Sequence, residues 1–214
     1  MENFFLVSIA ALFLLAMYAY RRHKARLAYI QSYQFPEAIS RAVSTTYPHL
    51  DDKQVALVLD TLKSYFLVAY KAKHQAVAMP SQVVDVAWHQ FILFTKNYQM
   101  FCKKGLGRFL HHTPTEAMKS PTKAQQGIKR TWRLACAQDL INPKLPNKLP
   151  MLFAIDALLN IEDGFFYSLN CKDKNSPAYG NNYCASHIGC SSGCSGSSGD
   201  SLSDSGCSSG CGGD

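Results

Sequence analysis

The residues of this sequence best suited to chemistry are one aspartate and three histidines, side-chain types that bind transition metals. Asp85 and His89 are four residues apart, so on a helix they would lie one turn apart on the same face. The segment 106–112 is long enough to fold back and bring His111 or His112 beside them. Asp85, His89 and one of these two histidines would form a site for zinc or another transition metal, with an open coordination position.

The same residues also have a simpler interpretation that involves no metal. Asp85 and His89 would then be an ordinary pair at positions i and i+4 of a helix, and His111 and His112 would hold a loop through hydrogen bonds. Only two of the ligands are set by local spacing. The spacing therefore favours this structural interpretation over the metal site.

Cys102 follows on the same predicted helix, but its position excludes a metal site shared with His89. On a straight helix the two residues are roughly 20 Å apart along the axis and about 140° apart around it, so one ion could not contact both. Cys102 falls on the apolar stripe that contains Trp88 and Tyr98 and points into the core, and we expect it to be a buried, small hydrophobic residue. A nucleophilic role is disfavoured, because the sequence offers no base nearby.

A second candidate for metal binding lies near the C-terminus, where Gly and Ser surround several cysteines. The sequence GCSSGC occurs at 189–194 and again at 206–211, and it contributes Cys190, Cys194, Cys207 and Cys211. The C-x2-C spacing of structural zinc sites is absent, and the composition favours a disordered, flexible tether. If this tail faces a reducing compartment, stable disulfides are not expected.

The N-terminus contains an apolar run that predicts a single transmembrane helix. The stretch from Phe4 to Tyr20 has seventeen residues without a charge and would span roughly 25 Å as a helix. A basic collar follows it, formed by Arg21, Arg22, Lys24 and Arg26, whereas a cleaved signal peptide has its positive charges before the apolar run. The collar predicts an N-terminus outside and a domain in the cytoplasm, at the plasma membrane, which in a bacterium is the inner membrane.

The formal net charge of +7 would suit a nucleic-acid-binding protein, but its distribution does not. Much of the charge belongs to the collar next to the apolar run, which is typical of a membrane protein. Residues 175–214 contain no Lys or Arg. We therefore expect the lipid bilayer as a partner, through Phe4 to Tyr20, and no nucleic acid.

The rest of the sequence predicts an all-α protein in three parts. These are the transmembrane anchor with its collar at 1–26, a compact helical domain at 27–170 and a Cys-, Gly- and Ser-rich flexible tail at 171–214. Capping residues and prolines mark the expected helix starts, at Pro36, Asp51–Asp52, Pro80–Ser81, Thr113–Glu116, Ser120–Pro121 and Met151. The helix that begins at Ser81 is predicted to be the central one and to end at Lys103, Lys104 and Gly105.

Several residues between Pro80 and Pro114 follow a known pattern: an Asp, then Trp-His on one helix, then Tyr, Cys, Gly and His. The corresponding residues are Asp85, Trp88, His89, Tyr98, Cys102, Gly107 and His111 or His112. This pattern resembles that of the glycine-rich-domain-containing-protein-like family. Phe91 stands where many members have a second histidine, so the resemblance implies less about metal binding. The family has no established activity, so no reaction is implied.

Common enzyme signatures are missing from the sequence. There is no H-E-x-x-H motif, and GLGR at Gly105 is predicted to end a helix rather than to form a phosphate-binding loop. We therefore expect a non-enzymatic, membrane-anchored binding or scaffold protein that presents the surface around Asp85, His89 and His111–His112 to an unknown protein partner. The alternative is a metal-binding or metal-dependent protein that uses these residues or the tail cysteines.

Overall fold

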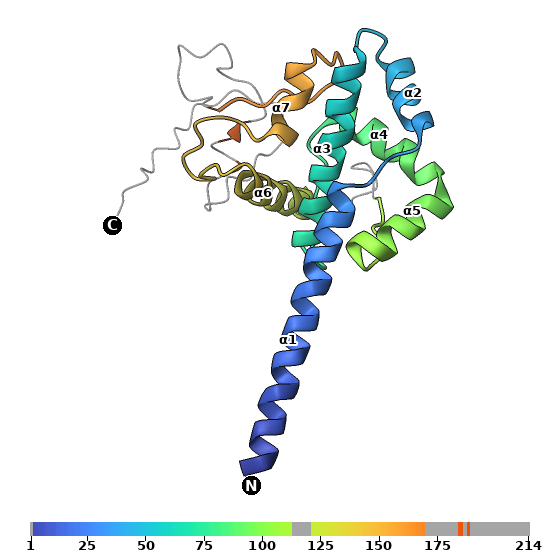
Figure 1. Ribbon diagram of the computed structural model, residues 1–214. Helices are drawn as coiled ribbons and strands as arrows, with labels where there is room; N and C mark the ends of the chain where they lie inside the picture. Colours follow the sequence, from blue (N-terminus) through green and yellow to red (C-terminus); the bar gives the residue numbers. More distant parts are fainter. Residues whose placement is uncertain (1, 113–120, 170–183, 186–187, 189–214) are drawn as a thin grey trace, which may run out of the picture.

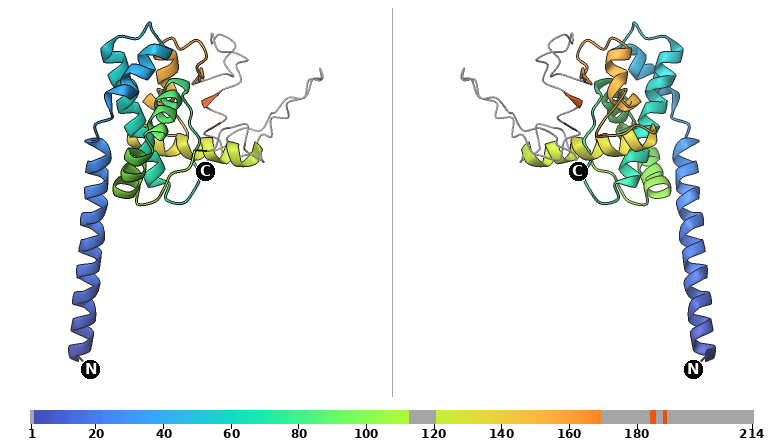
Figure 2. Two further views of the ribbon diagram at one scale, coloured as in Figure 1. Left: turned by 90° about the vertical axis from the view of Figure 1, so that its right-hand side faces the viewer. Right: turned by 90° about the vertical axis from the view of Figure 1, so that its left-hand side faces the viewer.

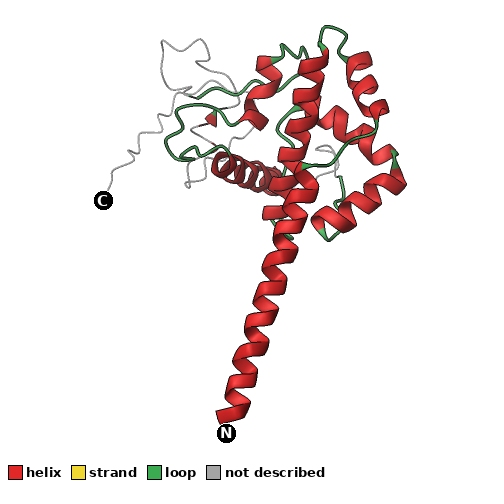
Figure 3. Ribbon diagram, viewed as in Figure 1, coloured by secondary structure: helices red, strands yellow, loops and turns green. Residues whose placement is uncertain are grey.

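The computed structural model describes residues 2–112, 121–169, 184–185 and 188. Within them every regular element is a helix (Figures 1 and 3). The helices are α1 (Glu2–Gln31), α2 (Glu37–Thr46), α3 (Asp52–Lys71), α4 (Gln82–Leu93), α5 (Thr95–Phe101), the π-helix η1 (Cys102–Leu106), α6 (Pro121–Gln138) and α7 (Met151–Leu158). The all-α prediction is confirmed for this part of the chain.

Helix α1 extends far beyond the rest of the protein (Figures 1 and 2). Its stretch Phe5–Gln31 is long and apolar enough to cross a membrane. The most apolar 18-residue segment of this stretch has no buried residue. The helix continues without interruption past residue 26, the predicted end of the anchor. Its last turns pack on the domain, where Ile30 is fully buried and the His23 Nδ1 atom lies 2.9 Å from the Tyr70 hydroxyl of α3. The apolar run and the domain are thus joined by one helix.

Side-chain caps fix the starts of α3 and α4. The Asp51 side chain accepts a hydrogen bond from the backbone N–H of Gln54, and the Gln54 side chain accepts one from the backbone N–H of Asp51. Ser81 accepts a hydrogen bond from the backbone N–H of Val84 at the start of α4. Both predicted starts are confirmed, because each cap satisfies N–H groups that have no partner within the helix.

Proline marks three further helix starts. Pro36 and Pro150 precede α2 and α7, and α6 begins at Pro121. Proline suits these positions because it has no N–H group and its φ angle is already close to the helical value. The capping box predicted at Thr113–Glu116 lies outside the described residues.

The predicted central helix is broken into α4, α5 and η1, and the prediction of one helix from Ser81 to Gly105 is wrong. The break is at Phe94, whose backbone leaves the helical region (φ −78°, ψ 60°). On a straight helix Phe91 and Phe101 would be about 15 Å apart along the axis. In the structure their ring centroids are 5.4 Å apart, within the hydrophobic core. The break therefore allows both rings to be buried together.

A buried carboxylate joins α7 to the start of α4. Asp156 is 1% exposed and accepts a hydrogen bond from the Ser81 hydroxyl at 2.6 Å. The backbone N–H groups of Gln82, Val83 and Phe165 also donate to it, at 2.7, 3.3 and 2.9 Å. Because the start of a helix attracts negative charge, the carboxylate is satisfied at this place although it is buried.

Two of the three described residues in the predicted tail are buried. Cys184 and Ala185 are 2% and 0% exposed, and the Ala185 backbone N–H donates to the Ser168 carbonyl at 2.8 Å. Cys184 is also disulfide-bonded, contrary to the expectation of free tail thiols. That expectation applied to a reducing compartment, whereas disulfides are typical of oxidising ones. Most of the predicted flexible tail lies outside the described residues.

Candidate metal centre

Asp85 and His89 both come from α4 and lie on the same side of it. Asp85 is in the first turn of the helix, the turn that Ser81 and Asp156 hold in place. The His89 Nδ1 atom is 3.3 Å from the Oδ2 atom of Asp85. The contact between Asp85 and His89 that their i, i+4 spacing predicts is therefore present.

His112 reaches the same carboxylate from the segment that follows η1. Gly107 ends η1 in the left-handed backbone region (φ 74°), and its N–H donates to the Cys102 carbonyl at 2.8 Å. The chain then folds back, so that the His112 Nε2 atom lies 3.1 Å from the Oδ1 atom of Asp85. The ring centroids of His89 and His112 are 4.2 Å apart. One carboxylate therefore contacts two histidines, through different oxygens.

The three side chains have a geometry that suits a metal ion. One potential ligand atom from each of Asp85, His89 and His112 lies within 4.8 Å of the other two. The ligand atoms of a tetrahedral zinc ion, with bonds of about 2.0–2.1 Å, are about 3.3 Å apart. The contacts of 3.1 and 3.3 Å are close to this separation, but they run to different oxygens of Asp85 and are equally hydrogen-bond distances. Solvent reaches the group from the side of His89, which is 49% exposed, against 14% for His112.

Buried hydrogen bonds fix the segment that carries His112. The Trp88 indole N–H donates to the Tyr98 hydroxyl oxygen at 3.2 Å, and the Tyr98 hydroxyl donates to the Leu110 carbonyl. Burial raises the pKa of Tyr98 well above its usual value, so the hydroxyl keeps the proton that it donates. The Trp88 ring also packs edge-on against the His112 ring, with centroids 4.5 Å apart.

These supporting roles of Trp88 and Tyr98 are not among the sequence predictions, which assign both residues to the stripe that packs the core. Both side chains are buried, as that assignment requires. The available signal was their polar atoms, because a buried indole or phenol usually finds a hydrogen-bond partner. Which partner it finds depends on the fold of the chain after η1.

A family model matches residues 25–188, which is more than half of the chain and includes all three side chains of the candidate centre. The protein belongs to the UCP032817-like family. The resemblance to the glycine-rich-domain-containing-protein-like family is therefore incorrect; it rested on a short local pattern, whereas the family model covers the helical domain. Comparison with curated proteins and with solved structures gave no match.

In this UCP032817-like domain Cys102 belongs to the core and not to the candidate centre. It is 1% exposed, and burial raises the pKa of its thiol above the usual value. Tyr65 packs nearby against Trp88, with ring centroids 5.0 Å apart. Its pKa is raised by burial and, to a smaller extent, by the negative charge of Asp85. Burial thus keeps the Cys102 thiol and the Tyr65 hydroxyl beside the centre neutral.

The other predicted metal ligands are not part of this group. His111 is exposed, and its ring packs against that of Phe109 with centroids 4.8 Å apart. The tail candidates Cys190, Cys194, Cys207 and Cys211 lie outside the described residues. Metal binding by the tail stays a prediction.

Proposed function

We propose that this protein is a membrane-anchored metal-binding protein whose centre, formed by Asp85, His89 and His112, binds a divalent transition metal such as zinc. The observation that carries the proposal is the placement of three potential ligand atoms within 4.8 Å of one another. His112 is 23 residues beyond His89, so helical spacing alone does not explain the group. Two imidazole nitrogens and a carboxylate oxygen are ligands that zinc accepts.

The proposed centre supplies three protein ligands and leaves one position of a tetrahedral ion for water or a small ligand. Catalytic zinc sites have this composition, whereas structural zinc sites use four protein ligands. A bound zinc ion would make its water more acidic and could support hydrolytic chemistry. The exposed side of His89 gives a small molecule access to that position.

We also propose that Phe4 to Tyr20 of α1 crosses the plasma membrane and that the domain lies in the cytoplasm. The basic collar supports this orientation, because Lys and Arg accumulate on the cytoplasmic side of membrane helices. The disulfide at Cys184 points to the opposite side, since disulfides persist in oxidising compartments. We give more weight to the collar, because charges next to a membrane helix act directly on its orientation.

Zinc titration of the full-length protein in a neutral detergent tests the metal centre. The background should carry serine in place of Cys190, Cys194, Cys207 and Cys211, so that the cysteines of the two GCSSGC repeats bind no metal. We expect about one zinc per chain from three ligands, and at least about a tenfold weaker affinity in His89→Ala or His112→Ala. The matched controls His111→Ala and His74→Ala replace exposed histidines outside the group and should bind zinc as the parent does.

Circular dichroism of each variant provides the control for folding. Unchanged zinc affinity in both His89→Ala and His112→Ala, with native helicity, would overturn the proposed centre. Zinc binding that disappears with the four tail cysteines would place the metal in the tail instead.

A metal-free binding surface is the second candidate function. Phe109 is 46% exposed and packs against His111, directly before His112 in the chain. Exposed aromatic side chains of this kind are common where proteins bind other proteins. Asp85 would then serve only to orient two rings of that surface. No zinc binding in the titration above would favour this second candidate.

A further inference from the structure

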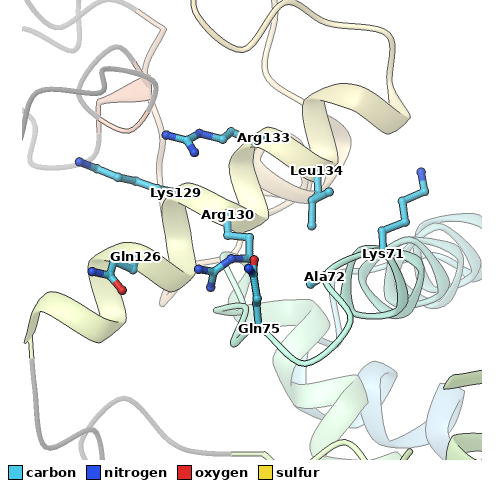
Figure 4. A pocket seen from close by; sticks show the side chains of 8 residues that line it. All are labelled: Lys71, Ala72, Gln75, Gln126, Lys129, Arg130, Arg133 and Leu134. Carbon is cyan, nitrogen blue, oxygen red and sulfur yellow. The ribbon is translucent and has the colours of Figure 1, made fainter. Parts of the chain in front are cut away.

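A pocket lined by four cationic side chains lies between the C-terminal end of α3 and α6 (Figure 4). Its volume is about 450 Å³. Lys71 lines it from α3, and Lys129, Arg130 and Arg133 line it from α6. Two glutamine side chains add amide groups, and no Asp or Glu is among the described residues that line the pocket.

No acidic side chain among the described residues balances the positive charge of this pocket. None of its four cationic side chains forms an ion pair within the described part of the chain. The sequence of α6 contains no acidic residue at all. Lys129 and Arg133 are four residues apart on α6, a spacing at which like charges repel each other and weaken a helix. A bound anion would relieve this repulsion.

Arg130 is the donor of the pocket best placed for a phosphate group, whereas the side chains of Lys71, Lys129 and Arg133 extend in other directions (Figure 4). Arg130 donates from Nη1 to the Ala76 carbonyl, and Figure 4 shows its side chain directed toward Gln75. The contact with Ala76 holds the guanidinium between the helices, and its other N–H groups, which have no partner among the described residues, can donate to phosphate oxygens. Ala72 and Leu134 give the same pocket an apolar side. An amphiphilic phosphate compound would use both kinds of surface, whereas a free, hydrated anion would use only one.

The pocket also lies near the level at which the apolar run of α1 ends. Tyr70, the residue before Lys71, has its hydroxyl 2.9 Å from the His23 Nδ1 atom, and the two rings stack with centroids 5.5 Å apart. His23 is three residues after Tyr20, the end of the run, which is a rise of about 4.5 Å. The C-terminal end of α3 and α6 both lie in the half of the domain from which α1 emerges (Figure 2). A membrane around α1 would therefore have its phosphate groups close to the pocket.

We propose that this pocket binds the phosphate group of an anionic phospholipid in the membrane that holds α1. The proposal rests on the proposed membrane anchoring by α1 and is independent of the metal centre. Two features favour a lipid over free phosphate. The pocket lies close to the end of the apolar run of α1, and Leu134 gives it an apolar side. A bound headgroup would fix the orientation of the domain on the membrane surface.

Native mass spectrometry of the full-length protein in a neutral detergent can test this proposal. Phosphatidylglycerol, phosphatidylcholine and inorganic phosphate serve as probes. The double variant Lys71→Gln/Arg133→Gln removes one charge from each wall of the pocket. The matched double variant Arg41→Gln/Lys53→Gln removes the same two charges at exposed positions elsewhere. The basic collar is present in every variant, so its contribution to lipid binding cancels.

We expect the pocket variant to bind phosphatidylglycerol about tenfold to thirtyfold more weakly than the parent, whereas the matched variant binds it like the parent. Phosphatidylcholine should bind weakly to all three proteins. Equal affinity of the pocket variant and the parent for phosphatidylglycerol would overturn the proposal. Inorganic phosphate that binds as tightly as phosphatidylglycerol would also overturn it, because the ligand would then be a free anion.

Two further measurements separate failure of the lipid pocket from misfolding of the variant and from failure of the membrane anchoring. Circular dichroism checks the fold of the pocket variant, and Lys129→Gln provides a milder single change if the double variant does not fold. Failure of the proposed anchoring would show itself separately, as release of the full-length protein from membranes by alkaline carbonate. Failure of the lipid pocket alone would leave the protein membrane-bound.

Discussion

Asp85 is the residue on which the candidate metal centre depends, because its two oxygens contact different histidines. Without a metal these contacts are side-chain hydrogen bonds, which contribute about 0.5–1.5 kcal/mol each to stability. Bound to a metal, the same three side chains would instead form coordination bonds. Changes at this group should therefore alter metal affinity much more than stability.

Tyr98→Phe should weaken zinc binding although residue 98 is no ligand. The substitution removes the hydrogen bond to the Leu110 carbonyl and leaves the Trp88 indole N–H without its partner, so the segment that positions His112 loosens. Partners that orient metal ligands typically change affinity by about 10–100-fold, and we expect the low end of that range here because Tyr98 acts through the backbone. Zinc titration measures the change.

Tyr70→Phe is the matched control, because the Tyr70 hydroxyl bonds His23 and not the segment that carries His112. It should leave zinc affinity unchanged. Equal weakening by both substitutions would mean that the effect of Tyr98→Phe is not specific to the support of His112.

At the scale of helices, the break at Phe94 and the π-helix η1 determine where the chain goes after α4. Gly105 of η1 packs directly on α1, where an added Cβ would be 3.0 Å from the Ile30 Cγ1 atom. Gly107 then ends η1 with a positive φ angle, which glycine adopts without strain. These two glycines allow the close packing and the reversal that bring the next segment back to α4.

Asp156→Ala should strongly destabilise the domain, because it removes the connection between α7 and the start of α4. Four N–H or O–H donors would lose their acceptor in a buried place. We expect a loss of about 3 kcal/mol or more in the free energy of unfolding. For a protein of this size that lowers Tm by on the order of 10 °C. Thermal unfolding followed by circular dichroism measures it.

Two substitutions define the specificity of this effect. Asp156→Asn keeps one acceptor oxygen and should cost less than Asp156→Ala. Asp60→Ala removes an exposed carboxylate whose only ion-pair partner among the described residues is Lys63, so it should change the free energy of unfolding by no more than about 0.5 kcal/mol. A loss in Asp156→Ala as small as that of Asp60→Ala would contradict the proposed role of Asp156.

For the whole molecule, the proposed membrane anchoring by α1 determines where the domain would lie. Helix α1 is continuous from the apolar run into the core, so the domain cannot move far from the membrane surface once α1 is inserted. The proposed metal centre and lipid pocket would then lie in the compartment that the orientation of α1 determines. The collar and the Cys184 disulfide indicate different compartments, which makes the orientation worth measuring first.

A C-terminal green fluorescent protein fusion should fluoresce, and a C-terminal alkaline phosphatase fusion should be inactive, because the first requires the cytoplasm and the second an oxidising compartment. Replacing Arg21, Arg22, Lys24 and Arg26 by glutamine should reduce this preference, since the collar sets the orientation. Phosphatase activity in the parent fusion would reverse the proposed topology and agree with the disulfide at Cys184.

The sequence by itself determined those features that depend on neighbours along the chain. The caps at Asp51 and Ser81 and the contact between Asp85 and His89 follow from spacings of three or four residues. The all-α class follows from the same local periodicity, although the separate helices α4, α5 and η1 do not.

Only the tertiary structure decided the features that depend on contacts between distant residues. It selected His112 rather than His111, broke the central helix at Phe94 and buried Asp156 at the start of α4. It also brought the cations of α6 next to the end of α3. None of these results is visible in local spacing, because each follows from how the helices pack around a shared aromatic core, where burial of rings outweighs the preference for one straight helix.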